Sequence, residues 1–381
     1  MKYFLLCCQG MADNPLQPLK DRTPLEVAKK PFMDELAKES KMGMVSWVPT
    51  SLEASRDVAA YSIFGYDPKE HYTGLAPLEA AARRLNFNDV SLVFRCDFIT
   101  LADQTLMDPQ AGKISDKEAQ LLIGELNKKI QKFNAKITPL SGYKNLLLIE
   151  SPQKNQDAGD IETVHPAKIR GESISKWLPK GALGPLAKEI MDASREVLEN
   201  HEVNRVRIDL NENPASMVWL WGQGKKPKLP PFMDKSKLKT KLWSESEAWK
   251  GLALSAGIDW MKTWNETEFT DFNMAYWYSP EMEFSKDYRA KVRHIEEFDA
   301  KVVGPVVKFL KKNKSQGKIF VTSDIVHSTE KGSDIHGYTP ILWWGNGVGE
   351  KALDVFCEKN CAQSGPLHDP GHTFITEFLK S

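Results

Sequence analysis

The hydrophobic pattern at the start of the chain alternates between two kinds of element. Residues 3–8 and 42–48 are short, nearly continuous apolar runs, which predict strands buried on both faces of a parallel sheet. Residues 23–27 predict the start of a helix, because a threonine N-cap is followed by Pro24 at the first helical position. A second short helix is predicted within residues 55–68, where a glycine and an Asp-Pro pair end it. Strands and helices in this order indicate a doubly wound α/β sheet.

The pattern changes after about residue 86, where short strand-like runs alternate with two long amphipathic stretches. Ser115 followed by Glu118 has the sequence of a capping box and predicts the start of a helix. A unit of mixed α+β type is therefore expected to be inserted into the sheet protein. Its predicted strands are residues 90–94, 145–149 and 203–208, and its predicted helices are residues 115–133 and 185–201.

Alternating strands and helices return after a lysine- and proline-rich linker at residues 225–231. This return indicates that the sheet domain is split in sequence between residues 1–85 and 225–381, with residues 86–224 as the inserted lobe. The elements expected in the second part are helices at residues 246–257 and 287–313, the latter kinked at Gly304-Pro305, and strands at residues 318–322 and 340–345.

Composition narrows the class of protein. With 41% hydrophobic and 27% charged residues, the chain has the balance of a folded globular protein. Lys plus Arg and Asp plus Glu both number 51, so no net charge favours nucleic acid or an anionic membrane as a partner. No apolar run approaches the ~20 residues of a membrane-spanning helix. The five cysteines are mostly far apart, which favours free thiols and a cytoplasmic location.

A zinc site is one interpretation of the last cysteines. Cys357 and Cys361 are followed by His368 and His372. The gap between the two pairs is shorter than the usual ~12–15 residues of a zinc finger. Packing is therefore the favoured interpretation, and zinc is the alternative.

The helix start at Ser55 and Arg56 carries the most informative chemistry. The first N–H groups of a helix have no partner within it, and together with the helix dipole they favour an anion. A guanidinium can hold a phosphate or carboxylate through two parallel hydrogen bonds. An anion bound at Arg56 is therefore one expectation, and a solvated surface arginine is the alternative.

The stretch at residues 55–68 also resembles the nucleophile helix of the archaeal-type 2,3-bisphosphoglycerate-independent phosphoglycerate mutases, a family of the alkaline phosphatase superfamily. Residues 57–68 follow the family's run except that Ala60 replaces an asparagine. The resemblance implies an alkaline-phosphatase-like doubly wound sheet with an inserted α+β lobe. Further segments that resemble the family are Gly10-Met11-Ala12-Asp13, Tyr72-Thr73-Gly74, Pro77-Leu78-Glu79-Ala80-Ala81, Asn213-Pro214-Ala215 and Trp219-Leu220-Trp221-Gly222.

The chemistry that the resemblance implies requires a serine nucleophile and two divalent metals, namely manganese, magnesium or zinc. The phosphoserine exchanges phosphate with glycerate and so interconverts 3-phosphoglycerate and 2-phosphoglycerate in glycolysis. In this chain Arg56 stands where the serine is expected. The resemblance implies that this position lies in a cleft, where Arg56, oriented by Asp324, is expected to bind a phosphate or carboxylate. Ser55 is a weak alternative nucleophile, which requires Arg56 to be an insertion.

The positions where the resemblance implies metal ligands are also changed. An arginine ~4 Å from a dication costs roughly 8 kcal/mol at an effective dielectric constant near 20. Lost ligands and an added guanidinium both oppose metal binding, so no metal or other cofactor is expected. The residues at lost ligand positions are Gln9, Pro280 and Phe284, and the remaining candidate ligands are Asp324, His327 and His336.

Positions where the resemblance implies substrate contacts are partly retained. Leu75 and Lys113 stand where an arginine and a histidine are expected, and Asn145 replaces a second histidine. The residues expected to bind a small phosphorylated or acidic ligand are Arg56, Arg95, Lys144, His165, Asn204 and Arg207.

The leading hypothesis is a phosphoglycerate mutase-like protein that is catalytically degenerate and retains at most metal-free binding of a small phosphorylated or acidic ligand. The first alternative is an active phosphoglycerate mutase with two divalent metals. The second is a protein-interaction module with a vestigial cleft. A protein partner or a homo-oligomer is compatible with each of them.

Overall fold

The computed structural model describes residues 1–150, 161–313, 316–345 and 353–380. The chain divides into two compact units, one formed by Met1–Tyr72 with Lys228–Ser381 and the other by Thr73–Pro227. The sequence-based boundaries were 85/86 and 224/225. The first boundary in the structure lies earlier because helix α5 (Leu75–Ala82) packs against strands of the second unit.

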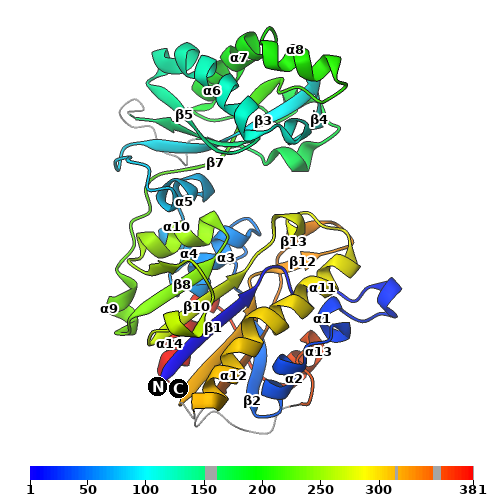
Figure 1. The fold of residues 1–381 in the computed structure, drawn as a ribbon, viewed down its shortest axis with the longest axis vertical. Helices are drawn as coiled ribbons and strands as arrows, with labels where there is room; N and C mark the ends of the chain where they lie inside the picture. The colour runs from blue at the N-terminus through cyan, green and yellow to red at the C-terminus, as the bar shows by residue number, and fades with distance from the viewer. Residues whose placement is uncertain (151–160, 314–315, 346–352, 381) are drawn as a thin grey trace. The chain divides into compact units, whose positions relative to one another are not determined.

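The first unit is built on an eight-stranded sheet (Figure 1). β14 is antiparallel to both of its neighbours, and all the other neighbouring pairs are parallel. Because β14 alone is reversed, the carboxyl ends of the other strands lie at one edge of the sheet. In spatial order the strands are β15 (Leu367–His368), β2 (Ser40–Val45), β14 (Thr339–Gly345), β11 (Gly317–Ser323), β1 (Lys2–Cys8), β10 (Phe272–Trp277), β8 (Thr240–Ser244) and β9 (Asp259–Met261).

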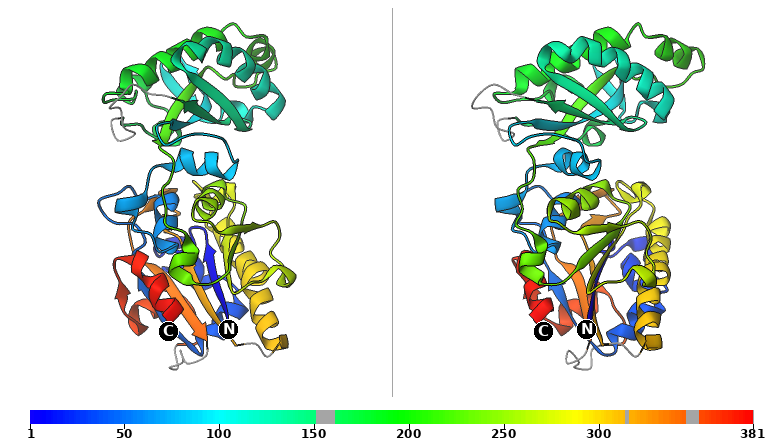
Figure 2. Two further views of the ribbon diagram at one scale, coloured as in Figure 1. Left: turned by 90° about the vertical axis from the view of Figure 1, so that its left-hand side faces the viewer. Right: turned by 60° about the vertical axis from the view of Figure 1, so that its left-hand side comes forward.

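Helices cover both faces of this sheet (Figure 1, Figure 2). Phe4, Leu6 and Cys8 of β1 alternate along the strand and pack in one core with α11 and α12. On the other face Phe320 packs against Phe374 with ring centroids 4.7 Å apart. The first face carries α1 (Pro24–Val27), α2 (Pro31–Ala37), α11 (Tyr288–Phe298), α12 (Gly304–Asn313) and α13 (Glu358–Ser364), and the second carries α3 (Arg56–Ile63), α10 (Glu247–Ser255) and α14 (Phe374–Lys380).

Two short helices, α4 (Pro68–His71) and α9 (Phe232–Ser236), lie near the ends of the first unit's two segments. Among the described residues, no helix is long and apolar enough to span a membrane.

The second unit is an antiparallel sheet with helices on both faces. Phe94 and Cys96 of β3 face a core shared with α6 and α7. Val93, on the opposite face of the same strand, packs with α5. The elements are β3 (Leu92–Ala102), β4 (Thr105–Asp108), β5 (Ala135–Ser141), β6 (Lys144–Ile149), β7 (Met217–Gly224), α6 (Asp116–Ile130), α7 (Gly184–Leu198) and α8 (Glu202–Asp209).

The predicted strand at residues 203–208 is wrong, because this segment is helix α8. Its valines and isoleucine favour a strand locally. The side chains that the structure buries, however, are Asn204 and Arg207, which are three residues apart and therefore lie on one side of a helix. Tertiary contacts of these two polar residues override the local preference.

The predicted helix at residues 287–313 is confirmed with one modification. A π-helical turn, Asp299–Val303, joins α11 to α12 just ahead of Gly304-Pro305. Proline lacks an N–H and collides with the carbonyl four residues earlier in an α-helix. The wider turn accommodates Pro305 and lets the helical path continue.

Candidate functional site

Loops that follow parallel strands meet at the carboxyl edge of the first unit's sheet. Gly10 follows β1, Tyr278 follows β10 and Asp324 follows β11. Ligands of open α/β sheets bind at this edge because several loops converge there. Gly10 has a φ of +53°, and a Cβ at this position would lie 3.0 Å from the His327 Cβ and 3.7 Å from the Arg56 Nη2. A glycine is needed for both the backbone conformation and this close approach.

Asp324 is fully buried at the centre of this edge. Its Oδ1 accepts hydrogen bonds from the Gly10 N–H at 2.6 Å and the Ile325 N–H at 2.8 Å. Its Oδ2 accepts from the Tyr276 hydroxyl at 2.6 Å. Burial raises the pKa of Asp324, and nearby Arg56 and the Tyr276 hydrogen bond oppose this only in part. The carboxyl group is therefore held by neutral donors on both oxygens.

Arg56 is the first residue of α3, and its guanidinium is bound to the chain itself. Nη2 donates to the Asp334 Oδ1 at 2.8 Å and lies 3.1 Å from the His327 Nδ1. The carbonyl oxygens of Met282 and Glu283 each lie 3.3 Å from the same nitrogen. Burial lowers the pKa of Arg56, but the nearby Asp334 and Asp324 carboxylates outweigh it and raise the pKa above its ordinary value. The side chain is 12% exposed and remains cationic.

Sequence reasoning missed Asp334. It lies on β13 (Ser333–Ile335), directly opposite His327 on β12 (Val326–Ser328), and the two side chains are 2.8 Å apart. Burial raises the pKa of Asp334, but Arg56 and His327 outweigh it and lower the pKa below its usual value. The sequence signal that could have revealed it is a short hairpin, in which two runs flank a turn ending at Gly332, with φ +67°.

The predicted role of His336 as a remaining ligand is not supported by its position. His336 follows β13 and is exposed, whereas Asp334 reaches Arg56. Alternation along a strand places residues two apart on one face, but β13 ends at Ile335, so this rule does not extend to His336. Asp334 takes the place beside Asp324 and His327 that the sequence analysis assigned to His336.

The three positions at which the resemblance implied lost metal ligands lie around this cluster, and none of them supplies a charged side chain. Gln9 is buried, and its Oε1 accepts from the Ser279 N–H at 2.7 Å. Pro280 begins a short 3-10 turn. Phe284 is 44% exposed. The loop after β10 contacts Arg56 through the backbone carbonyl oxygens of Met282 and Glu283.

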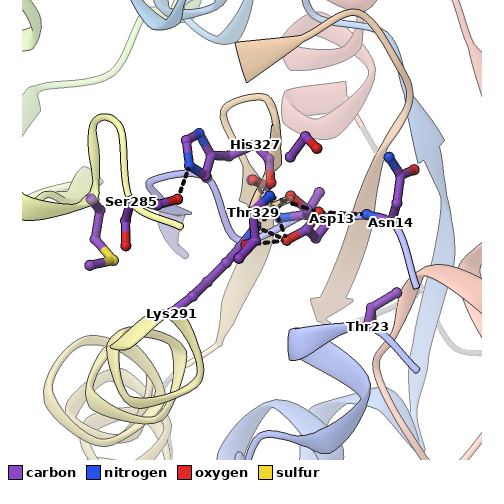
Figure 3. A network of polar contacts seen from close by, with 12 residues as sticks. Asp13, Asn14, Thr23, Ser285, Lys291, His327 and Thr329 are labelled. Carbon is purple, nitrogen blue, oxygen red and sulfur yellow. Dashed lines mark hydrogen bonds and ion pairs between the residues drawn. The ribbon is translucent and has the colours of Figure 1, made fainter. Parts of the chain in front are cut away.

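A second buried cation, Lys291, contacts the segment that carries His327 (Figure 3). Lys291 of α11 donates to the Asp13 Oδ2 at 2.8 Å, to the Ala12 carbonyl at 3.1 Å and to the His327 carbonyl at 2.7 Å. The Thr329 hydroxyl donates to the same Asp13 oxygen at 2.5 Å. Burial lowers the pKa of Lys291, although Asp13 opposes the shift. This network fixes the segment after β1 to the hairpin that carries His327.

These residues do not fit a pair of divalent metals. Both oxygens of Asp324 already accept hydrogen bonds, and Asp334 is paired with Arg56. Both ring nitrogens of His327 are engaged, since Nε2 lies 3.0 Å from the Ser285 carbonyl (Figure 3). A dication here would also be repelled by the Arg56 guanidinium. Within the described residues, no three or more Cys, His, Asp or Glu side chains are arranged to hold a metal ion.

The cysteines are all free and buried. The Cys361 Sγ lies 3.7 Å from the Ile341 carbonyl, and the His368 ring packs at 4.8 Å from Phe374. In the described part of the chain these two side chains contact the neighbouring strand β14 and helix α14.

Ser55 is the N-cap residue of α3, and its side chain makes no capping hydrogen bond. Its hydroxyl instead hydrogen-bonds Asp57, which also accepts from the Tyr72 hydroxyl. Burial raises the pKa of Asp57. Ser55 therefore directs its hydroxyl toward Asp57 rather than toward the Asp324 and Asp334 cluster.

In the second unit, Arg95 and His165 belong to one buried cluster. Arg95 donates to Glu79 at 2.8 Å and to the Asp97 Oδ1 at 2.7 Å. The Trp221 indole N–H donates to the other Asp97 oxygen at 2.8 Å, and its ring lies 4.1 Å from that of His165. Burial, with Arg95 as the next contributor, lowers the pKa of His165 to about 3.

Asn204 and Arg207, both on α8, lie in a different cluster. Asn204 donates to the Leu198 and Ala215 carbonyls at 2.8 Å. Arg207 pairs with Glu118 at 2.9 Å and also with the Asn213 carbonyl at 3.0 Å. These contacts join α8 to α6 and to the segment before β7. Lys144 lies near enough to His165 to contribute to the lowering of the pKa of that histidine, and its ammonium is 5.8 Å from the Tyr143 ring centroid.

The fold and the cluster define a class of α/β protein with a mostly parallel sheet, a second unit with an antiparallel sheet, and a charged site at the carboxyl edge of the first sheet. A family model of 2,3-bisphosphoglycerate-independent phosphoglycerate mutase matches residues 37–204. The mutase of that name from Methanothrix thermoacetophila is 34% identical over 96% of both chains. A probable mutase from Geobacter sulfurreducens is 32% identical over 100% of both chains. The chain belongs to the 2,3-bisphosphoglycerate-independent phosphoglycerate mutase family.

Solved structures share the fold. A Pyrococcus horikoshii protein has a TM-score of 0.79 at 22% identity, covering 100% of this chain and 96% of its own. The cofactor-independent phosphoglycerate mutase from Thermoplasma acidophilum has a TM-score of 0.61 at 21% identity, covering 100% and 99%. The family and the α/β fold expected from the sequence are thereby confirmed.

Proposed function

We propose that this chain is a phosphoglycerate mutase-like protein that does not carry out the serine- and metal-dependent phosphoryl transfer of its family. The observation that carries the proposal is the position of Arg56, which begins the helix where the nucleophile is expected and is bound to Asp334 at 2.8 Å. A guanidinium cannot attack a phosphate ester, because it stays protonated. It also places a positive charge where two cations would have to bind.

The alternative of an active mutase is favoured by the comparisons, since relatives of that name match nearly the whole chain. An active enzyme would need a nucleophile and ligands other than those expected at residues 9, 56, 280 and 284. Ser55 is the nearest hydroxyl in sequence, and it is bonded to Asp57.

Metal-free ligand binding is proposed only as a weak residual property. Arg56 is paired with Asp334, and Arg95 is paired with Glu79 and Asp97. A phosphate would have to compete with these carboxylates for the same guanidinium groups. If the dissociation constant is ~10 mM, 10 mM ligand stabilises the protein by only about 0.4 kcal/mol. A thermal shift with 3-phosphoglycerate or sulfate, measured without metal, should therefore stay below about 1 °C.

Mutase turnover tests the proposal directly. The full chain would be assayed with 3-phosphoglycerate in the presence of manganese or magnesium, with the Methanothrix relative as the positive control. We expect turnover equal to a blank without protein. We also expect Arg56→Ser to remain inactive, because Gln9, Pro280 and Phe284 still supply no charged ligand. Turnover that exceeds the blank and is abolished by a chelator would overturn the proposal.

A further inference from the structure

The acceptors around Arg56 come from separate segments of the first unit. They comprise the Asp334 carboxylate and the His327 ring from the β12–β13 hairpin, and the Met282 and Glu283 carbonyls from the loop after β10. The Asp324 Oδ2 lies 4.0 Å from the Arg56 Nε, just before the same hairpin begins. One side chain therefore joins α3 to two other segments at the carboxyl edge of the sheet.

The spacing of these acceptors suits a hydrogen-bonding cation. Their distances from Nη2 are 2.8 to 3.3 Å, which is the range of N–H···O and N–H···N bonds. Oxygen and nitrogen ligands of magnesium or zinc lie at about 2.0–2.2 Å. The acceptors would have to move inward by roughly 0.6 Å or more to bind such an ion.

We propose that this set of acceptors is a guanidinium-binding site, filled by the chain's own Arg56 and able to take a guanidinium ion from solution when residue 56 is shortened. This inference rests on the proposed function, because a protein that binds two metals here would have no room for the guanidinium. In this site Arg56 is a cation tethered to the chain. It takes the place of bound metal beside Asp324 and Asp334.

Charge balance supplies the driving force for recruiting the ion. Asp334 is 17% exposed and Asp324 is fully buried, so removal of Arg56 leaves two carboxyl groups without their cation. A buried charge without a partner is strongly unfavourable. A guanidinium can donate hydrogen bonds to the Asp334 carboxylate and to a neighbouring carbonyl oxygen through the two N–H groups of one nitrogen, whereas a metal ion donates none.

The site also holds the loop after β10. Arg56 contacts the carbonyls of Met282 and Glu283, and His327 contacts that of Ser285. Phe284 lies between these anchored residues and is 44% exposed. Cleavage by chymotrypsin after Phe284 therefore reports whether the cation is in place.

The test uses the Arg56→Ala variant of the full chain and ethylguanidinium, which matches the part of the side chain that is removed. We expect 20 mM ethylguanidinium to raise the Tm of Arg56→Ala by about 2 °C or more and to slow cleavage after Phe284 severalfold. Wild type and Arg56→Lys should not respond, since each still carries a cation. Urea at the same concentration, a planar molecule without charge, should have no effect on any variant.

Two comparisons make the result decisive. In Arg56→Ala/Asp334→Asn the main acceptor charge is absent, so the response to ethylguanidinium should be lost. If Arg56→Ala does not fold alone, recovery of soluble folded protein only when it is refolded with ethylguanidinium supports the inference. No response in either measurement, or stabilisation by manganese chloride but not by ethylguanidinium, would overturn it. These measurements use no substrate, so their failure is distinct from failure of the mutase assay.

Discussion

At the scale of single residues, Arg56 is held by a partner that sequence reasoning did not identify. The resemblance identified the position as unusual and pointed to Asp324 as its orienting partner. In the structure the closest carboxylate is Asp334 at 2.8 Å, and Asp324 is 4.0 Å away. This pairing depends on the β12–β13 hairpin, whose register cannot be deduced from three-residue strands. The sequence could therefore predict the changed residue but not its environment.

A double-mutant cycle on Arg56 and Asp334 should measure this pairing. Removal of one member of a buried ion pair commonly costs about 3–5 kcal/mol, because the other charge stays buried. Arg56→Ala should fall in this range, and Asp334→Asn should cost less, since Asp324 remains nearby. The double variant should be more stable than the sum of the two losses implies. Urea unfolding of the four proteins gives the coupling free energy, and simple additivity would show that the pair contributes nothing specific.

At the scale of elements, strong local signals were predicted well and weak ones were not. The capping box at Ser115 is present in the structure, with both of its hydrogen bonds. The helix α8 was missed because the residues that it buries are polar, and one of them, Arg207, pairs with Glu118, which is 89 residues away in sequence. The π-helical turn before Pro305 could not be predicted either. The sequence shows that a proline interrupts the helix, but it does not show whether the helix kinks, ends or widens there.

That π-helical turn carries a buried carboxyl group with a measurable pH effect. Asp299 accepts hydrogen bonds from the Phe32 N–H at 3.1 Å and the Met33 N–H at 2.8 Å, at the start of α2. Burial raises the pKa of Asp299 to about 6 despite these bonds. The unfolded value is about 3.9, so the folded state binds more protons between about pH 4 and pH 6. This contribution to stability is present below pH 4 and is lost as the pH rises through about 6.

Asp299→Asn should remove this contribution. Between about pH 4 and pH 6 its free energy of unfolding should rise more steeply with pH than that of wild type, by up to about 1.4 kcal/mol per pH unit. Urea unfolding at half-unit steps of pH measures the difference. Identical slopes for the two proteins would mean that the Asp299 carboxyl group titrates as it does in the unfolded chain.

At the scale of the whole molecule, each unit has its own hydrophobic core and its own histidine with a lowered pKa. His165 of the second unit has its pKa lowered to about 3, mainly by burial. His294 of the first unit has its pKa lowered to about 4 for the same reason, and its Nδ1 accepts from the Trp277 indole N–H. Both histidines stay neutral in the folded protein while they gain protons in the unfolded chain.

The two histidines should make both units sensitive to acid. Their contribution to stability is present above about pH 6.5 and is lost as the pH falls toward 4, by up to about 1.4 kcal/mol per pH unit for each group. Asp299 opposes part of this loss in the first unit. Calorimetry between pH 7 and pH 4.5 should show the transitions moving to lower temperature, and His165→Gln should reduce the shift of the second unit's transition. A Tm independent of pH in this range would contradict the expectation.

The central claim is that a guanidinium stands where the family's metals would bind, and metal content tests it most directly. The full chain would be purified without chelator, incubated with manganese, freed of excess ion by gel filtration, and analysed by mass spectrometry of the elements, with the Methanothrix relative treated in parallel. The account predicts far less than one equivalent of manganese, magnesium or zinc per chain. Two equivalents retained by the wild-type chain would contradict it.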